Sequence, residues 1–185
     1  MARRLDNLAR RQLPYAAATA LNDTAKVAAN SVRKELPRIF DRPTPFTMNA
    51  ISMTRATKGR LQARVFVKDR RAEYLEVQET GGTRTPEKRA IVLPRAIRTN
   101  QYGNTARGTF AAAKARKGVS SAVIDGVAGL YQRTKGKLKL LAFYTTKATY
   151  KPRFGFKRRV TKVAASVLPV AFRQSLAKAL ATARR

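Results

Sequence analysis

The sequence predicts an α+β fold in which an antiparallel sheet with hairpins packs against long N-terminal and C-terminal helices. Two observations carry this prediction. Apolar residues recur at helical spacing near both ends of the chain, and segments joined by Lys-Gly and rich in alternating apolar residues lie between them. A long basic loop separates the two hairpins. With 185 residues, the chain is expected to form one domain over 1–185.

The first predicted helix covers residues 14–36. Pro14 suits its first turn, because the missing N–H of proline has no helical partner there. Pro37 is expected to end the helix, since a residue before proline avoids the helical region. The apolar stripe consists of Ala17, Ala18, Leu21, Ala25, Ala28, Val32 and Leu36. So many alanines allow a covering element to approach the backbone closely.

Two hairpins are predicted over 51–68 and 127–144. Each contains a Lys-Gly turn, Lys58-Gly59 in the first and Lys135-Gly136 in the second. In both turns, glycine is expected to supply the positive φ.

Side-chain alternation sets the faces of these hairpins. In the first, one face is expected to carry Leu61, Ala63, Val65 and Val67. In the second, a two-residue turn places Tyr131 opposite Leu140 and Arg133 opposite Leu138.

The C-terminal segment predicts a helix over 157–183. Pro169 lies inside it and is expected to kink the helix or split it in two. The apolar stripe consists of Val160, Val163, Ala164, Val167, Leu168, Ala171, Phe172, Leu176, Ala179 and Leu180.

Between the hairpins, Ala90–Leu93 predicts a short buried strand, and residues 95–118 predict an exposed loop. This loop is basic and interrupted by glycine, with a helical turn expected near Phe110–Ala115. Loops of this length are usually functional or mobile.

Charge is the most informative property of the composition. Lys and Arg number 40 against 10 Asp and Glu, which gives a formal net charge of +30. Asp125 is the last acidic residue, so the remaining 60 residues carry only positive charge. Such a surface repels its own copies and attracts polyanions. The sequence therefore predicts a large, negatively charged partner, either nucleic acid or acidic protein.

The composition also excludes several kinds of chemistry. The chain has no Cys and no His, so it lacks thiolate ligands, cysteine nucleophiles and the usual general base. Asn22 and Asp23 interrupt the Ala-rich N-terminal run, and neither a signal peptide nor a membrane span is expected. We expect no cofactor, no small-molecule substrate and no membrane partner, in the cytosol or in a particle assembled there.

No motif predicts an enzyme. Glu73, Glu76 and Glu79 recur every three residues, but we interpret them as a solvated acidic edge rather than as a catalytic or metal site. The segment Gly103–Thr109 spaces its glycines like a phosphate loop but lacks the lysine, and we interpret it as a flexible loop. The aspartates are scattered singly.

The candidate contact residues for a partner or for DNA form two basic groups. The first group lies in the loop: Arg95, Arg98, Arg107, Lys114, Arg116 and Lys117. The second group lies before and within the last helix: Lys151, Arg153, Lys157, Arg158 and Arg159. A merely solvated basic surface explains both groups equally well. Any nucleic-acid contact would be to phosphate, without sequence reading.

Aromatic residues alternate with the second basic group, as in proteins that hold single strands. The alternative, which we favour, is that Tyr144, Phe154 and Phe156 are core rings and that the neighbouring Lys and Arg side chains form a solvated edge.

Three stretches resemble a known family. They are PYAAATALNDTAKVAANSV near the start, GLYQRTKGKLKLLAFY in the middle and VLPVAFRQSLAKALATA at the end. Their order and content are similar to the minor tail protein Z, or tail-completion, family of tailed bacteriophages. The segment NQYGNTARGTF also looks like a loop of related phage neck and tail proteins.

The resemblance implies a structural virion protein, assembled in the bacterial host cytoplasm, that forms a ring at the head–tail junction or at the tail terminus. It implies portal, adaptor or tail-tube proteins as partners around a DNA channel. The absence of catalytic equipment fits this interpretation. The channel walls of this class are often acidic, in which case the positive charge would face protein partners.

Two other function classes stay open. A ribosomal-type or other non-specific nucleic-acid-binding protein would account for the charge by itself. An enzyme acting on an acidic polymer would need a carboxylate pair in a cleft, which the sequence does not indicate.

Overall fold

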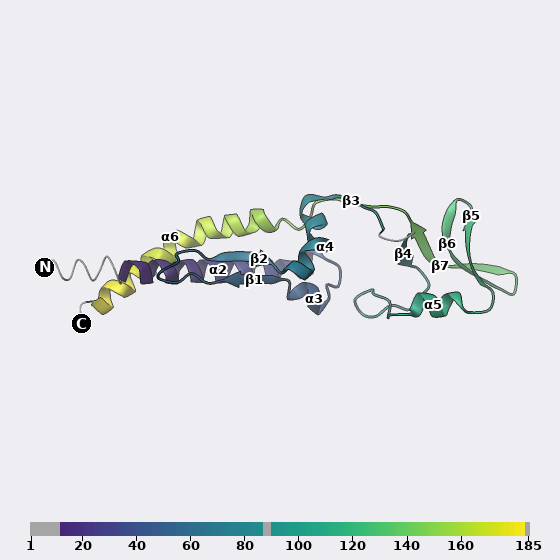
Figure 1. Cartoon of the computed structure of the whole chain (residues 1–185), viewed down its shortest axis with the longest axis horizontal. Helices are drawn as coiled ribbons and strands as arrows, with labels where there is room; N and C mark the ends of the chain where they lie inside the picture. Colours follow the sequence, from purple (N-terminus) through teal and green to yellow (C-terminus); the bar gives the residue numbers. More distant parts are fainter. Residues whose placement is uncertain (1–11, 87–89, 184–185) are drawn as a thin grey trace. The chain divides into compact units, whose positions relative to one another are not determined.

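The computed structural model describes residues 12–86 and 90–183 and has an α+β fold, which confirms the predicted fold class. The chain divides into two compact units: unit 1 is Met1–Leu75 with Arg153–Arg185, and unit 2 is Glu76–Pro152. The single domain expected from the chain length stays a prediction. Each compact unit has an apolar cluster of its own. Figure 1 shows the elements of each.

Unit 1 is built on two long helices, α2 (Leu13–Ile39) and α6 (Phe156–Ala183), which pack against each other (Figure 1). The buried face of α2 is mostly alanine, as predicted, and ends in Val32 and Leu36. Small side chains on α2 let the backbones of two packed helices approach closely.

The prediction for Pro37 is wrong, and of the two effects predicted for Pro169, a kink or a split, the split does not occur. Pro37 lies inside α2, which continues to Ile39 and is closed by the Phe40 amide donating to the Leu36 carbonyl at 3.0 Å. Pro169 does not split α6. Pro37 and Pro169 are both exposed, so water can reach the carbonyl that each leaves without a helical donor.

The first hairpin lies in unit 1 and confirms the prediction over 51–68. Strands β1 (Ile51–Thr54) and β2 (Arg64–Val67) are antiparallel, with Ile51 opposite Val67. A bridge from Thr57 to Arg60 encloses the Lys58-Gly59 turn. Gly59 does not adopt a positive φ, so that part of the prediction is wrong.

The core of unit 1 lies where α2 meets the hairpin. Its buried residues are Ala29, Val32, Leu36, Ala50, Ile51, Leu75 and Phe154. Leu75 comes from α4 (Asp69–Thr80), and the short helix α3 (Pro45–Met48) precedes β1. Phe154 contacts the rings of Phe40 and Phe156, with centroids 5.8 and 5.7 Å away.

Unit 2 contains a four-stranded antiparallel sheet in the order β4-β7-β6-β5. Its strands are β4 (Ile91–Pro94), β5 (Val119–Ile124), β6 (Val127–Thr134) and β7 (Lys137–Thr145). The strand predicted over Ala90–Leu93 exists as β4, but it is an edge strand and only half-buried, with Leu93 47% exposed. A second pair joins β3 (Gly82–Arg84) to β8 (Ala148–Tyr150).

The β6–β7 hairpin confirms the prediction over 127–144 in detail. Tyr131 lies opposite Leu140 and Arg133 opposite Leu138. The turn has positive φ at both residues, 47° at Lys135 and 78° at Gly136. The sequence did not predict the β-bulge between Leu130 and Tyr131.

The loop over 95–118 is mostly exposed, as predicted, and its helical turn is α5 (Thr109–Lys114). Ala113 of α5 is buried in a cluster with Leu130, Leu141 and Ala142, so α5 covers one face of the sheet. The loop is not wholly irregular: the Asn100 side chain accepts hydrogen bonds from the amides of Tyr102 and Asn104 at 2.9 and 3.0 Å.

Candidate polyanion interface

A large group of basic side chains with almost no acid among them lies in unit 2. Residues 91–145 contain ten basic residues and a single acid, Asp125. Six of the ten are candidate contacts predicted from the sequence. The other four, which were not predicted, lie on the β6–β7 hairpin: Arg133, Lys135, Lys137 and Lys139.

The fold brings half of the predicted loop residues next to these four. The chain leaves α5 through a turn and enters β5, and the Arg133 amide donates to the Gly118 carbonyl at 2.8 Å. Gly118 is needed at this contact, because its φ is 75° and a Cβ there would lie 2.7 Å from the Arg133 carbonyl oxygen. We call the resulting cluster the basic end of unit 2. It consists of Lys114, Arg116, Lys117, Arg133, Lys135, Lys137 and Lys139.

All seven side chains of the basic end are exposed. Register places Lys139 opposite Gln132, which in turn lies opposite Val119 at the start of β5. Lys139 and Lys137 therefore share the sheet face that α5 covers, while Arg133 lies on the other face. Cations on both faces of one hairpin tip form a surface that an extended polyanion can contact along its length.

Asp125 does not neutralise this cluster. It lies in the β5–β6 turn, at the opposite end of the eight-residue strand β6, about 25 Å away at about 3.3 Å per residue. At physiological salt the interaction of exposed charges is largely screened beyond about 8 Å. The basic end is thus electrostatically alone within the sheet.

Of the other three loop residues, Arg95 lies apart from the basic end. The Arg95 guanidinium lies over the Phe143 ring, 5.5 Å from its centroid. Arg98 and Arg107 are exposed within the loop. All six are close in the chain, but the sheet separates Arg95, next to β4 at one edge, from Lys117, next to β5 at the other.

The second predicted group does not form one surface. Lys151 belongs to unit 2, while the other four belong to unit 1. Arg153 lies over the Phe40 ring at 5.2 Å, and Arg159 pairs with Glu35 at 3.5 Å. Arg159 is only 34% exposed and its Nε is buried without a hydrogen-bond partner, so this residue joins α6 to α2 rather than facing a partner. Lys157 and Arg158 are exposed.

The aromatic residues near this group are structural. Phe154 is buried in the unit 1 core, and Tyr144 packs against the unit 2 cluster. A ring buried as Phe154 is cannot stack on bases. The arrangement therefore favours contact with phosphates rather than the single-strand mode that alternating rings and cations suggested.

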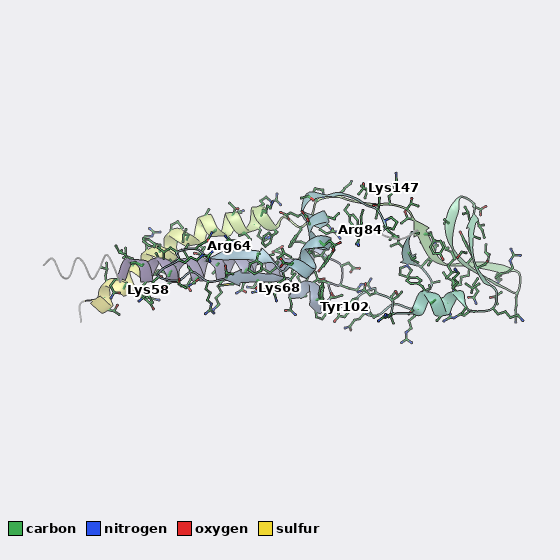
Figure 2. The ribbon with its side chains drawn as sticks, in the orientation of Figure 1. Lys58, Arg64, Lys68, Arg84, Tyr102 and Lys147 are labelled. Atoms are coloured by element: carbon green, nitrogen blue, oxygen red, sulfur yellow. The ribbon has the colours of Figure 1, made fainter. Side chains whose placement is uncertain are left out.

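Basic side chains also occur away from the basic end. Figure 2 labels Lys58, Arg64 and Lys68 in unit 1 and Arg84 and Lys147 in unit 2. Ten carboxylates in the whole chain can neutralise at most ten of its 40 cations. The remainder requires anions from outside the chain.

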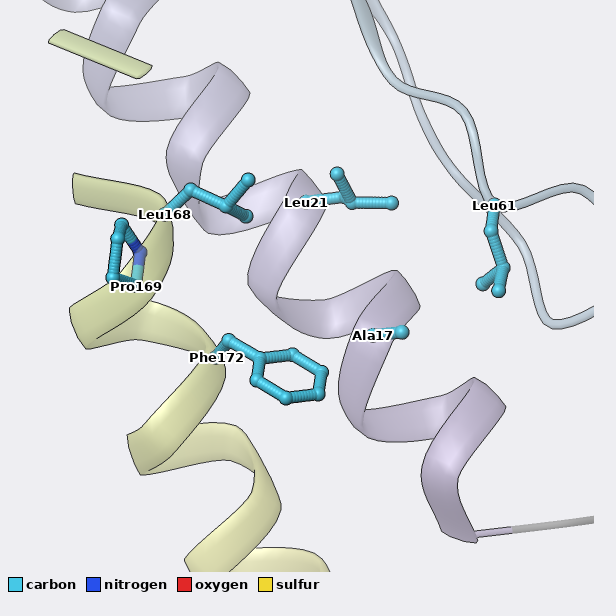
Figure 3. A pocket seen from close by; sticks show the side chains of 6 residues that line it. All are labelled: Ala17, Leu21, Leu61, Leu168, Pro169 and Phe172. Carbon is cyan, nitrogen blue, oxygen red and sulfur yellow. The ribbon is translucent and has the colours of Figure 1, made fainter. Parts of the chain in front are cut away.

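Unit 1 contains an apolar groove of about 430 Å³ between its two helices and the first hairpin (Figure 3). Its lining comes from α2, α6 and the segment before β2: Ala17, Leu21, Leu61, Leu168, Pro169 and Phe172. No lining residue carries a polar side-chain group, so the groove suits an apolar side chain of a partner better than a substrate.

Comparisons with known proteins identify no relative: no family model matches the chain, and neither a curated protein nor a solved structure is significantly similar to it. Over residues 12–86 and 90–183, no three Asp or Glu side chains gather in a way that could hold a metal ion. None of the described helices has the length and apolarity that crossing a bilayer requires.

Proposed function

We propose that this chain is a structural virion protein of a tailed bacteriophage, a tail-completion or neck component that joins head and tail around the DNA channel. It acts without catalysis, as one copy in a ring, in contact with portal, adaptor or tail-tube proteins. It is assembled into the virion in the host cytoplasm.

One observation carries the proposal. The first and last of the three stretches that resemble the tail-completion family lie on α2 and α6, which pack against each other although more than 100 residues separate them in the chain. The resemblance thus concerns a helix pair that organises unit 1. The middle stretch coincides with the β6–β7 hairpin of unit 2.

Charge and surface chemistry support the same proposal. Thirty positive charges in excess need anionic neighbours, which a particle filled with DNA supplies in abundance. The apolar groove and the basic end offer two different kinds of contact, one for protein and one for a polyanion.

The test is to produce phage particles with and without the gene for this chain. We expect the protein in purified particles, at a fixed ratio to the portal protein by quantitative mass spectrometry. Without the gene, we expect DNA-filled heads and tails that fail to form infectious particles, visible by electron microscopy. Full infectivity without the gene, together with absence of the protein from particles, contradicts the proposal.

The basic end of unit 2 favours a second candidate function, sequence-independent binding of nucleic acid. Its seven exposed cations would contact phosphates of any duplex, and log K would fall by about 0.9 per contact for each unit of log salt. Fluorescence anisotropy with two duplexes of unrelated sequence separates the candidates. Equal, salt-sensitive affinity supports this function, and no binding at low salt rejects it.

A further inference from the structure

The two edges of the four-stranded sheet differ in how they are protected. An exposed edge presents unpaired backbone groups to other chains, and natural edges are usually blocked by proline, lysine, a bulge or a covering segment. Strand β4 forms one edge and β5 the other.

The β4 edge is blocked. The Arg95 amide donates to the Leu141 carbonyl at 2.9 Å. This bond shows which residues of β4 direct their backbone N–H and C=O groups toward β7, because every second residue of an edge strand does so. Ile91 and Leu93 therefore direct their backbone groups toward β7, while Val92 and Pro94 direct theirs outward. Pro94 has no N–H, so this short edge offers a single donor.

The β5 edge is open. The Arg133 amide donates to the Gly118 carbonyl, so Gly118 and every second residue after it direct their backbone groups toward β6. Val119, Ser121 and Val123 therefore direct their backbone groups outward. The Val119 amide donates to the Arg116 carbonyl at 3.2 Å. No described segment pairs with the remaining outward groups, which are two N–H donors and three carbonyls.

The side chains of β5 do nothing to prevent pairing. The strand contains no charged residue, no proline and no bulge, and Val123 is 71% exposed. Between Lys117 and Arg133 the only charged residue is Asp125, in a chain of which 27% is charged. Along this strand, two copies of a +30 chain meet no like charges on the paired residues themselves.

We propose that β5 is a self-association site, at which a second copy of this chain adds its own β5 antiparallel to the first, with Ser121 opposite Ser121. Only outward-directed residues of the two copies can exchange hydrogen bonds, so the alternative registers differ by shifts of two residues. The Ser121-centred register is the one that uses all three outward positions, with Val119 of each copy opposite Val123 of the other. Ser121 N–H then donates to the Ser121 carbonyl of the other copy, and Val123 N–H to the Val119 carbonyl.

Charge complementarity supports this register and this occupant. At the strand ends, it brings the turn that holds Lys117 in each copy toward the turn that holds Asp125 in the other, because both residues lie four positions from Ser121. The single acid of the sheet thus lies near a base of the other copy, and the two-fold axis repeats this contact. A two-fold contact uses the same strand of both copies, so it joins two copies only. The contacts that would build a larger ring of subunits must lie on other surfaces. The inference does not depend on the proposed virion function.

Hydrogen exchange of the full chain, measured over a concentration series at high salt, tests the proposal together with sedimentation. High salt screens the repulsion between copies, so association should strengthen with salt. As dimer forms, the Ser121 and Val123 amides should become protected, whereas those of Ala122 and Ile124 should be protected at every concentration. A monomer at all concentrations overturns the proposal, and so does a dimer in which Ser121 and Val123 exchange as in the monomer.

Variants at the edge sharpen the test. Val123→Pro removes an outward donor at a position where an edge strand tolerates proline, and should weaken dimerisation roughly tenfold or more, since each dimer loses two hydrogen bonds. Val123→Thr keeps the N–H and the branched shape and should leave the dimer intact. Unchanged protection of Leu130 and Ala142 shows that the sheet of each variant is folded. A dimer of Val123→Pro with wild-type affinity overturns the proposal.

A charge swap tests the register without proline. Lys117→Glu and Asp125→Lys should each weaken the dimer, and the double variant should restore it. Lysine fits at position 125, because Lys135 has a similar positive φ in the other turn of β6. Failure of the double variant to recover, with both single variants weakened, overturns the Ser121-centred register.

Discussion

The two hairpins share a Lys-Gly turn but are held in place differently. The β6–β7 hairpin is continuous from its turn into the strands, with Thr134 opposite Lys137 and further neighbours on both sides. The β1–β2 hairpin pairs over only four residues at its base, and one extra residue on its second arm separates these pairs from the bridge at the turn.

Helix α2 supplies what the first hairpin lacks. The Asn22 side chain donates to the Ala56 carbonyl at 3.0 Å and accepts from the Ala56 amide at 2.8 Å. The Arg33 Nη2 donates to the Ile51 carbonyl at 2.8 Å. A short ladder can therefore persist where a helix satisfies the backbone of a strand, whereas the second hairpin depends on its turn and on neighbouring strands.

The largest expected effect tests whether the two units unfold independently of each other. Leu36→Ala removes a fully buried side chain from the unit 1 core and should cost about 2–5 kcal/mol. Because unit 2 has its own cluster, hydrogen exchange should accelerate in α2 and α6 and stay unchanged at Leu130 and Ala142. Leu138→Ala, at a 44% exposed position, is the control and should change stability little. Equal acceleration in both units would mean that they unfold as one.

Next in size is the loss of the helix-to-hairpin contact. Asn22→Ala leaves the Ala56 amide, on a buried residue, without its acceptor and should cost about 1–3 kcal/mol. Urea denaturation gives the change, and exchange at Ala56 should accelerate more than exchange at Tyr131. Asn30→Ala, which removes only an exposed contact to Arg33, should have a small effect. If Asn22→Ala lowers the free energy of unfolding no more than Asn30→Ala does, the β1–β2 hairpin is stable without the contact to α2.

The turns themselves should respond in opposite directions. Gly136→Ala forces a side chain into a φ of 78° and should cost about 1–2 kcal/mol. Gly59→Ala meets no atom within 4 Å and no positive φ, so it should be neutral or stabilise by about 0.4–1 kcal/mol through the unfolded state. Thermal unfolding of the two variants provides the comparison. Equal destabilisation would show that the turns share one conformation.

The smallest effect per residue concerns polyanion binding. Replacing Lys135, Lys137 and Lys139 by glutamine should lower the slope of log K against log salt by about 2.7 for duplex DNA, from three lost phosphate contacts. The matched control replaces Lys58, Arg64 and Lys68, which are equally exposed on the first hairpin (Figure 2). Anisotropy titrations at several salt concentrations measure both. Equal slopes for the two triple variants would show that DNA binding depends on the total charge and not on the position of the basic residues.

Much of the fold could be predicted because it depends on local patterns. The spacing of alanines in α2 and the alternation in β6 and β7 are properties of neighbouring residues, and both hairpins and both long helices were predicted within a few residues. Errors arose where tertiary packing competes with local preference. Pro37 sits in a helix whose buried face maintains the helical backbone around it.

The candidate site was predicted only in part. Lys114, Arg116 and Lys117 were selected from the loop, but Arg133 and the three hairpin lysines were not, since strand residues were judged by their apolar partners. Arg159 was selected for its charge, although Glu35 and the burial of its Nε give it a place between two helices. Distances across a sheet or between helices cannot be read from spacing in the chain.

The excess of positive charge, the lack of Cys and His, and the positions of the helices and hairpins follow from composition and periodicity, which are written in the chain. The division into two compact units, the gathering of seven cations at one end of a sheet, and the contrast between the open β5 edge and the blocked β4 edge emerge only on folding. Burial and strand order depend on contacts between segments far apart in the chain, and local preference carries no information about them.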